Sequence, residues 1–340
     1  MTALDLRGLA FSFRTAIRGA TQLALALAAA LFAGHANAQA FPKSPITIVV
    51  PFSPGGLPDI VARTVATELS TELGQAVVVE NVSGASGTIA TSRVAKAKPD
   101  GYTLIAGVWN THVANGAIFK SDIDLVQDFT PVGLIGGAPL VLVASAKVPA
   151  DNMKELINWM KANPGKASAG TVGFGSPSNL LIDSLKRRTQ TDFTMVNYRG
   201  SGAQIQDLIA GTLSFTVSNA ATSLPHIKAG TMKAIAVTGD KRLAIAPEFP
   251  TISEAGFPDL EISQWVALFA PGKTPQPVVK VLNAALVKAL QSPELAARVE
   301  GYGFQLAPAN RQSPQALAEF QKQEIAKWWP VIKEAGIKPQ

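Results

Sequence analysis

The sequence predicts a fold of two α/β lobes, and three observations support this prediction. Short strands rich in β-branched residues alternate with amphipathic helices, which is typical of βαβ units in a mostly parallel sheet. A strand, a glycine-rich turn and a helix follow one another after residue 45, and the pattern begins again after residue 139. The chain is expected to cross between the lobes near Gly136–Leu140 and to return near Gln264–Phe269. Two crossings predict a hinge, with a ligand cleft between the lobes.

In the first lobe, Ile46–Val50 is an apolar run that predicts a strand. The helix predicted for Pro58–Leu73 places its apolar residues on one side, and Gly74 follows as its C-terminal stop. Further strands are expected at Ala76–Val79 and Tyr102–Ala106, with a helix between them that ends at about residue 96.

In the second lobe, Ser176 is the expected N-cap of a helix, with Pro177 at its first position. The strands expected there are Leu140–Ala144, Ala167–Val172, Phe193–Tyr198, Leu213–Val217 and Ile235–Val237. The helices expected there and in the C-terminal tail are Met153–Ala162, Ser178–Arg188, Gln204–Ala210, Val278–Leu290, Pro293–Val299 and Pro314–Ala335.

The N-terminus has the features of an export signal. Three arginines precede the apolar run Leu23–Phe32, and Ala36-Asn37-Ala38 supplies the small residues that a signal peptidase reads. A membrane-spanning helix needs about 20 apolar residues, and this run is shorter, so we do not expect a membrane anchor. We expect cleavage near Ala38 and a periplasmic mature chain. Residues 1–38 are therefore interpreted as a signal peptide.

Composition excludes several classes of function. The 340 residues include no cysteine, which excludes disulfides and cysteine-ligated metals. Without residues 1–38 the net charge is 27 − 23 = +4, and aromatic residues make up 7% of the chain without interleaving among basic ones. We therefore expect no nucleic-acid partner, while the modest positive excess suits small anionic ligands.

The first glycine turn, Ser53-Pro54-Gly55-Gly56, joins the strand Ile46–Val50 to a helix. Unpaired N–H groups and the helix dipole favour an anion at such a position, so one interpretation is carboxylate binding by the backbone. An ordinary tight turn is the alternative. Asp59 lies in the first helical turn, where compensation of the dipole is favoured over ligand contact.

A second glycine turn, Gly173-Phe174-Gly175-Ser176-Pro177-Ser178-Asn179, repeats this arrangement without an acid in the first turn. The third glycine of a dinucleotide-binding turn is missing, because Ser178 occupies its place. This turn therefore predicts a second anion site.

Two other loops contribute candidates to the cleft. Ser83–Gly87, which contains Ala85, is interpreted as an ordinary loop that also provides a wall. Trp109 and Asn110 follow a strand at its ligand-binding end. Trp109 either contacts an apolar ligand body or packs in the core, and Asn110 either bonds a carboxylate or caps a loop.

Patterns typical of catalysis are not found. His112 and His226 are the histidines of the mature chain, and they lack the spacing of a zinc site. A nucleophile elbow of the type Gly-x-Ser-x-Gly does not occur. We therefore expect a binding protein that is not an enzyme, with no cofactor and no metal.

The chain resembles the Bug-type periplasmic solute-binding proteins, the extracytoplasmic receptors of tripartite tricarboxylate transporters. The resemblance extends over nearly all of the mature chain. It rests on seven motifs in order: Pro45–Arg63, Glu80–Gly87, Lys98–Leu104, Asp128–Ile135, Gly170–Leu180, Asn197–Gly211 and Pro250–Pro258.

The resemblance implies a type II periplasmic-binding fold, in which two lobes close around a small carboxylate. We then expect lobe 1 to comprise residues 39–139 and 265–340, and lobe 2 residues 140–264. The implied partners are the permease subunits of the transporter, and the implied state is a monomer. The candidate ligand-binding residues are Ser53, Pro54, Gly55, Gly56, Leu57, Asp59, Ala85, Trp109, Asn110, Gly175, Ser176, Ser178, Asn179, Tyr198 and Ser218.

The chain departs from the family pattern in ways that bear on the ligand. The family often has an aspartate where Ser218 stands, and a cleft without that acid offers less to an ammonium group. We therefore expect a mono- or dicarboxylate without an amino group. One alternative is a sensing subunit that feeds a signalling kinase. A less favoured alternative is an exported enzyme that uses the same cleft.

Overall fold

The computed structural model describes residues 41–172, 175–198 and 201–336 of the chain. From Ser44 onward the chain forms one compact unit, and every helix and strand below belongs to it. The predicted signal peptide, residues 1–38, lies outside the described residues. Within the described part of the chain, no helix has both the length and the apolar character needed to cross a membrane.

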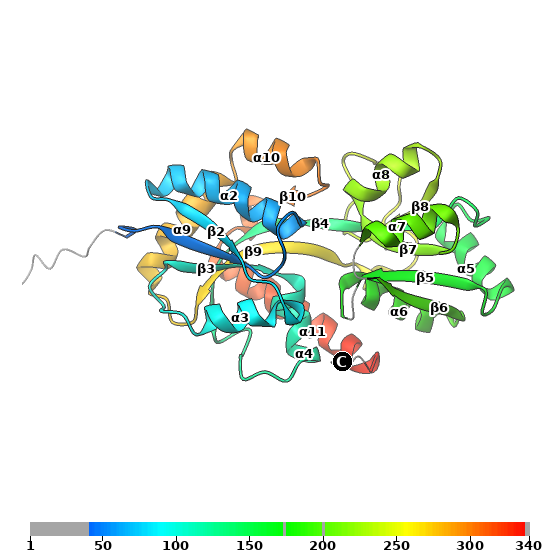
Figure 1. Ribbon diagram of the computed structural model, residues 1–340, viewed down its shortest axis with the longest axis horizontal. Helices are drawn as coiled ribbons and strands as arrows, with labels where there is room; N and C mark the ends of the chain where they lie inside the picture. The colour runs from blue at the N-terminus through cyan, green and yellow to red at the C-terminus, as the bar shows by residue number, and fades with distance from the viewer. Residues whose placement is uncertain (1–40, 173–174, 199–200, 337–340) are drawn as a thin grey trace, which may run out of the picture. The chain divides into compact units, whose positions relative to one another are not determined.

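The strands of the described residues form one mixed sheet in the order β2-β1-β3-β9-β4-β7-β5-β6, with β8 and β10 also paired to β4 (Figure 1). Their bounds are β1 Ile46–Val50, β2 Val77–Asn81, β3 Thr103–Val108, β4 Phe129–Ser145, β5 Ala167–Val172, β6 Phe193–Tyr198, β7 Phe215–Asn219, β8 Met232–Val237, β9 Ser263–Pro271 and β10 Gln305–Leu306.

Helices cover the sheet on both faces. In the first lobe α2, α9 and α10 pack together on one face, and α3, α4 and α11 lie on the other (Figure 1). The longer helices are α2 Leu57–Leu73, α3 Thr88–Ala95, α5 Met153–Ala162, α6 Pro177–Thr189, α7 Ser201–Ala210, α8 Ala220–Lys228, α9 Gln276–Ala289, α10 Pro293–Glu300 and α11 Pro314–Glu334. The shorter ones are η1 Ala85–Gly87, the π-helix η2 Asn110–Ala114, α4 Asn115–Ile118, η3 Pro258–Leu260 and η4 Ala309–Arg311.

One strand, β4, belongs to both lobes. Its residues 129–139 pair antiparallel with β9, while residues 140–144 pair with β7 and residues 141–145 pair with β8. The sequence predicted only Leu140–Ala144 as a strand, because prolines and glycines interrupt the β pattern before it. The change of partner at Leu140 falls within the crossing predicted at Gly136–Leu140.

The directions of the strands set which loops face each other. β3 and β4 both run antiparallel to β9, so β3 and β4 have the same direction. Their carboxyl ends point toward the second lobe. β1 and β2 are parallel to β3. β7 runs antiparallel to β4, and β5 and β6 are parallel to β7, so these strands point back toward the first lobe. The carboxyl ends of both sets of strands therefore face each other across the hinge.

Thr238 ties the two crossings together. Its Oγ1 donates to the carbonyl of Ile262 at 2.6 Å and accepts the N–H of Leu140 at 2.8 Å. Its backbone bonds the same two residues, at 2.8 Å to Leu140 and 2.9 Å to Ile262. Thr238 is completely buried, so water does not replace these bonds when one is lost.

Thr238→Val is therefore expected to lower the free energy of unfolding by roughly 1–3 kcal/mol, because it leaves a buried N–H group and a buried carbonyl unpaired. Thr67→Val is the matched control, since the hydroxyl of Thr67 makes one exposed bond within α2. Urea unfolding of both variants measures the difference. Equal losses in the two variants would contradict the role given to Thr238.

Candidate functional site

The first glycine turn connects β1 to α2 at the edge of the sheet that faces the second lobe. Its residues Ser53, Pro54, Gly55 and Gly56 are exposed, and Leu57 is half-buried. Gly55 has φ +86°, a conformation that favours glycine. These residues stand on a rigid base, because the β1 residues Ile46, Ile48, Val49 and Val50 are completely buried.

The N-terminus of α2 has no side-chain cap. Gly56 is the N-cap residue, with φ −77° and ψ 163°, and it makes no side-chain cap hydrogen bond. The first helical bond runs from the N–H of Ile60 to the carbonyl of Gly56 at 3.0 Å. Backbone donors ahead of that bond, together with the helix dipole, suit a negatively charged oxygen. A Cβ added at Gly56 would have its nearest neighbours at 3.8 Å, which is ordinary van der Waals contact, so a side chain there meets no clash at Cβ.

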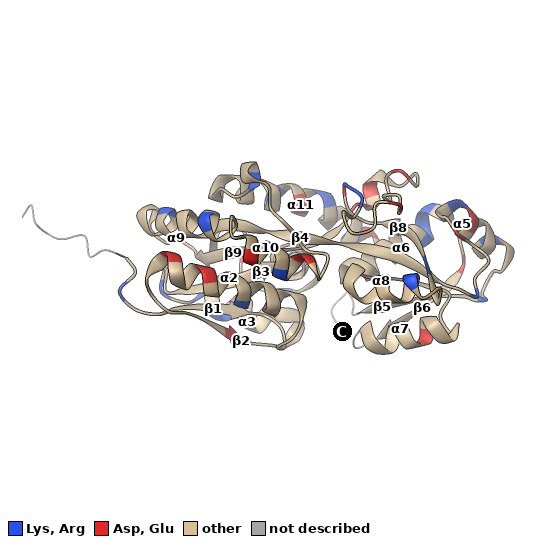
Figure 2. Cartoon of the chain, turned by 90° about the horizontal axis from the view of Figure 1, so that it is seen from above, with Lys and Arg blue, Asp and Glu red and all other residues tan. Residues whose placement is uncertain are grey.

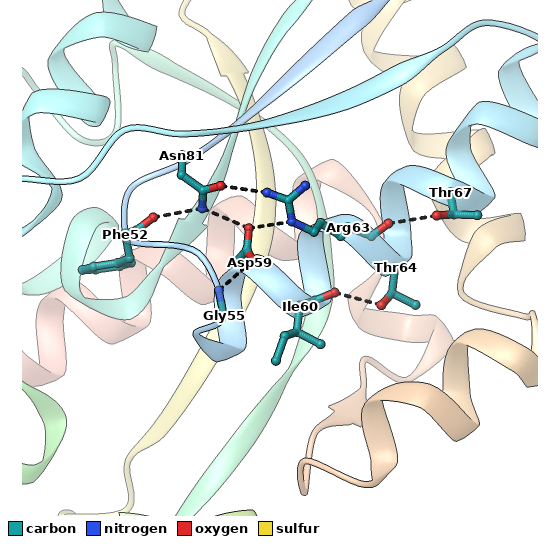
Figure 3. A network of polar contacts seen from close by, with 8 residues as sticks. All are labelled: Phe52, Gly55, Asp59, Ile60, Arg63, Thr64, Thr67 and Asn81. Carbon is teal, nitrogen blue, oxygen red and sulfur yellow. Dashed lines mark hydrogen bonds and ion pairs between the residues drawn. The ribbon is translucent and has the colours of Figure 1, made fainter. Parts of the chain in front are cut away.

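Asp59 holds this turn in place (Figure 3). Its Oδ2 accepts the N–H of Gly55 at 2.9 Å, and its Oδ1 accepts from Arg63 Nε at 3.0 Å and from Asn81 Nδ2 at 2.9 Å. Asn81 Nδ2 also donates to the carbonyl of Phe52 at 3.0 Å, and Arg63 Nη2 donates to Asn81 Oδ1 at 2.8 Å. Both carboxylate oxygens of Asp59 are thus bonded to the protein itself.

The sequence favoured dipole compensation for Asp59, and the structure adds a more specific task. Asp59 joins the turn to α2, and Asn81 at the end of β2 joins it to the neighbouring strand. Arg63 and Asn81 were not among the candidates. Their contribution depends on a contact between segments 18 residues apart, which no local motif signals.

The pKa of Asp59 is lowered from its ordinary value of 3.8. Burial acts to raise it, but the hydrogen bonds from Gly55, Asn81 and Arg63, with the positive charge of Arg63, outweigh burial. A lowered pKa in the folded state means that the stabilisation is present above pH 3.8 and is lost as the pH falls through the folded-state pKa.

Asp59→Asn is accordingly expected to lower the free energy of unfolding by about 1–3 kcal/mol at neutral pH, with a smaller difference from wild type below pH 3.8. Urea unfolding at several pH values measures this. Thr71→Val on the same helix changes no ionisable group and is the control, whose difference from wild type should be the same at every pH. A deficit in Asp59→Asn that stays constant down to pH 3 would argue against the lowered pKa.

The loop after β2 adopts an unusual backbone. Ala85 and Ser86 have φ of 45° and 54°. This left-handed conformation costs a residue with a side chain roughly 1–2 kcal/mol. The side chain of Asn115 donates to the carbonyl of Ser86 at 2.9 Å and so fixes the loop on α4. Ala85 itself is exposed on this wall.

Trp109 and Asn110 lie where β3 ends. Trp109 is completely buried, and its ring packs edge-on against Trp328 with 5.6 Å between centroids. This placement corresponds to the core-packing alternative for Trp109 and corrects the expectation of a ring that faces an open cleft. Asn110 is half-buried at the start of η2. π-helical turns of this kind are frequent at functional sites.

The second glycine turn differs from the first, because its side chains bond one another. Ser176 caps α6 as predicted: its Oγ accepts the N–H of Asn179 at 3.2 Å and lies 3.0 Å from Ser178 Oγ. Asn179 Oδ1 accepts the N–H of Gly175 at 3.2 Å, and all four residues are buried. Gly173 and Phe174 lie outside the described residues.

The second turn also touches the first lobe. A Cβ built on Gly175, where φ is +67°, would lie 2.1 Å from Cδ1 of Ile118 at the end of α4. The positive φ favours glycine at this position, and the end of the Ile118 side chain would have to move to admit a Cβ.

Two further candidates differ in how they are bonded. The hydroxyl of Tyr198 donates to Asp207 at 2.5 Å, and burial together with this bond raises the pKa of Tyr198 to about 12. Ser218 at the end of β7 is buried, and its Oγ has no hydrogen-bond partner within the described residues. Next to it Asn219 begins α8 without a side-chain cap, and its Oδ1 also lacks a partner there.

The α8 terminus was not among the sequence predictions, and Pro225 inside that helix weakens the local helix signal. It is a third helix N-terminus at the edges that face each other. Among the described residues no cluster of three or more His, Asp or Glu side chains is placed to hold a metal. His112 is completely buried, which lowers its pKa to about 3 and keeps it neutral.

Comparison with known proteins shows that this chain is similar to members of one protein family. A family model described as "Tripartite tricarboxylate transporter family receptor" matches residues 61–337. The chain is 35% identical to protein BugT of Bordetella pertussis over 314 residues, which cover 92% of this chain and 95% of BugT.

Solved structures show the same architecture. MatC from Rhodopseudomonas palustris with bound malate is 35% identical, with a TM-score of 0.74, and covers 86% of this chain and 100% of its own. A second R. palustris protein, solved with adipate, is 35% identical, with a TM-score of 0.76, and covers 88% and 100%. The periplasmic binding protein BugD is 33% identical, with a TM-score of 0.74, and covers 88% and 100%.

Proposed function

Because the chain belongs to the tripartite tricarboxylate transporter receptor family, whose members are periplasmic binding proteins with this two-lobed α/β fold, we propose that it binds a small carboxylate between its lobes. The observation that carries the proposal is the exposed, uncapped N-terminus of α2, on the sheet edge that faces the second lobe. A carboxylate loses hydration worth several kcal/mol on binding, and charge-assisted N–H bonds from the turn replace it.

In this proposal the two lobes do different work. Backbone donors at Gly56 and Leu57 bind one carboxylate, and Asp59 acts as a positioning residue that keeps the turn rigid. The second lobe closes over the ligand and contributes polar atoms at Ser218 and Asn219, which have no partner within the described residues. After removal of residues 1–38 the protein acts in the periplasm. Closure of its lobes changes the surface that it presents to the permease subunits in the membrane.

The proposed ligand is a mono- or dicarboxylate without an amino group. The second lobe offers neutral hydroxyl and amide groups at Ser218 and Asn219, with no acid at either position to pair with an ammonium ion. Malate in MatC and adipate in its relative are of this class.

A panel of acids tests the ligand class. Malate and adipate are expected to raise the melting temperature, because a ligand that binds only the folded state stabilises it. Aspartate and glutamate should leave it unchanged. Native mass spectrometry of the purified protein then identifies any bound acid and shows whether it is returned without chemical change. A shift with the amino acids alone would refute the proposed class, and a converted ligand would indicate an enzyme.

A further inference from the structure

A cavity of about 590 Å³ lies beside the hinge, and none of the candidate residues of the glycine turns lines it. Its walls come from β4 and β9 at the crossing, from the turn after β8, from β10 and η4, and from α11. The volume is in the range of small-molecule sites, and the cavity is distinct from the carboxylate site proposed above.

Three cationic side chains from separate segments line this cavity. They are Arg311 in η4, Lys327 in α11 and Lys241 after β8. In the described part of the chain neither Arg311 nor Lys241 belongs to an ion pair. The guanidinium of Arg311 lies 5.8 Å from the ring centroid of Phe320, so its donors remain available to a ligand.

Three acidic residues, Asp240, Glu261 and Glu324, also line the cavity, so its acidic and basic side chains are equal in number. Glu261 accepts a hydrogen bond from the hydroxyl of Ser253. Glu324 is half-buried on α11, which carries residues of both signs (Figure 2). Burial raises the pKa of Glu324 despite the opposing effects of Lys327, Trp265, Trp109 and Arg311. The case for an anionic ligand therefore rests on the three cations, none of which belongs to an ion pair among the described residues.

An apolar surface lies next to these charges. Trp265 and Phe320 pack edge-on with 5.8 Å between centroids, and Leu134 and Leu306 extend the same wall. Aromatic and aliphatic side chains with a few converging polar groups are the usual composition of a small-molecule site.

We propose that this hinge cavity is a second binding site, for a small organic acid with an apolar body. Its carboxylate binds Arg311 and Lys327, and its apolar part contacts the half-buried side chains of Leu306 and Phe320. Trp265 lies opposite Gly137 in the hinge strands, and Lys241 follows the last strand of the second lobe. Occupancy of this site is therefore linked to the angle between the lobes and, through it, to closure over the first ligand.

Titration calorimetry with benzoate and octanoate as probes tests the site. Arg311→Ala is expected to weaken probe binding about tenfold, the loss typical of one charge-assisted contact. Glu324→Gln should strengthen it, because a negative charge beside the incoming carboxylate is removed. Lys322→Ala, an exposed change on α11 outside the cavity, is the matched control and should bind like wild type.

Binding that survives Arg311→Ala unchanged would overturn the site, as would the absence of probe binding at millimolar concentration. Weaker binding in Glu324→Gln would overturn the anionic ligand, since it would indicate a cation. Gly56→Val separates this site from the first: retained probe binding in that variant supports a distinct cavity, and complete loss there contradicts it. Melting temperatures of all variants confirm folding.

Discussion

The antiparallel pairing of β4 with β9 is the constraint on which the rest of the molecule depends. Both strands pass through the hinge, and Pro139 lies opposite Ser263 where the partners of β4 change. Because every other strand takes its direction from this pair, the carboxyl ends of β1 and β3 face those of β5 and β7. Loops distant in sequence are thus brought to the same side of the hinge, and the bonds of Thr238 hold the two crossings together.

The two glycine turns show how one motif serves two purposes. At the first turn the capping position is a glycine, and Asp59 anchors the turn from within the helix, so the first-turn donors stay exposed. At the second turn Ser176 caps α6, and its neighbours bond each other in a buried cluster. In the proposed function the first turn is therefore a preorganised anion site, while the second provides a rigid surface that closes over the ligand.

Sequence reasoning predicted most of the fold, because local signals marked the elements. Gly74 ends α2 with φ +62°, and Ser176 with Pro177 begins α6. It missed residues 129–139 of β4, since tertiary pairing with β9 overrides the prolines and glycines there.

The site was predictable only where backbone conformation defines it. The glycine turns were found from their composition, but the bonds of Asn81 and Arg63 depend on strands brought together by the fold. Trp109 shows the same limit. Its place after β3 suggested a cleft residue, whereas its packing on Trp328 involves a helix more than 200 residues later in the chain.

The most direct measurement of the central claim is the affinity of Gly56→Val for malate or adipate, whichever shifts melting more. Gly56 has an ordinary φ, and a Cβ there makes only ordinary van der Waals contacts, so a valine leaves the lobe folded while its branches block the approach of a carboxylate to the turn. Gly301→Val, at a position with open space around it, is the control. Binding abolished at Gly56 and retained at Gly301 is the predicted result, and wild-type affinity in Gly56→Val would contradict backbone recognition at this turn.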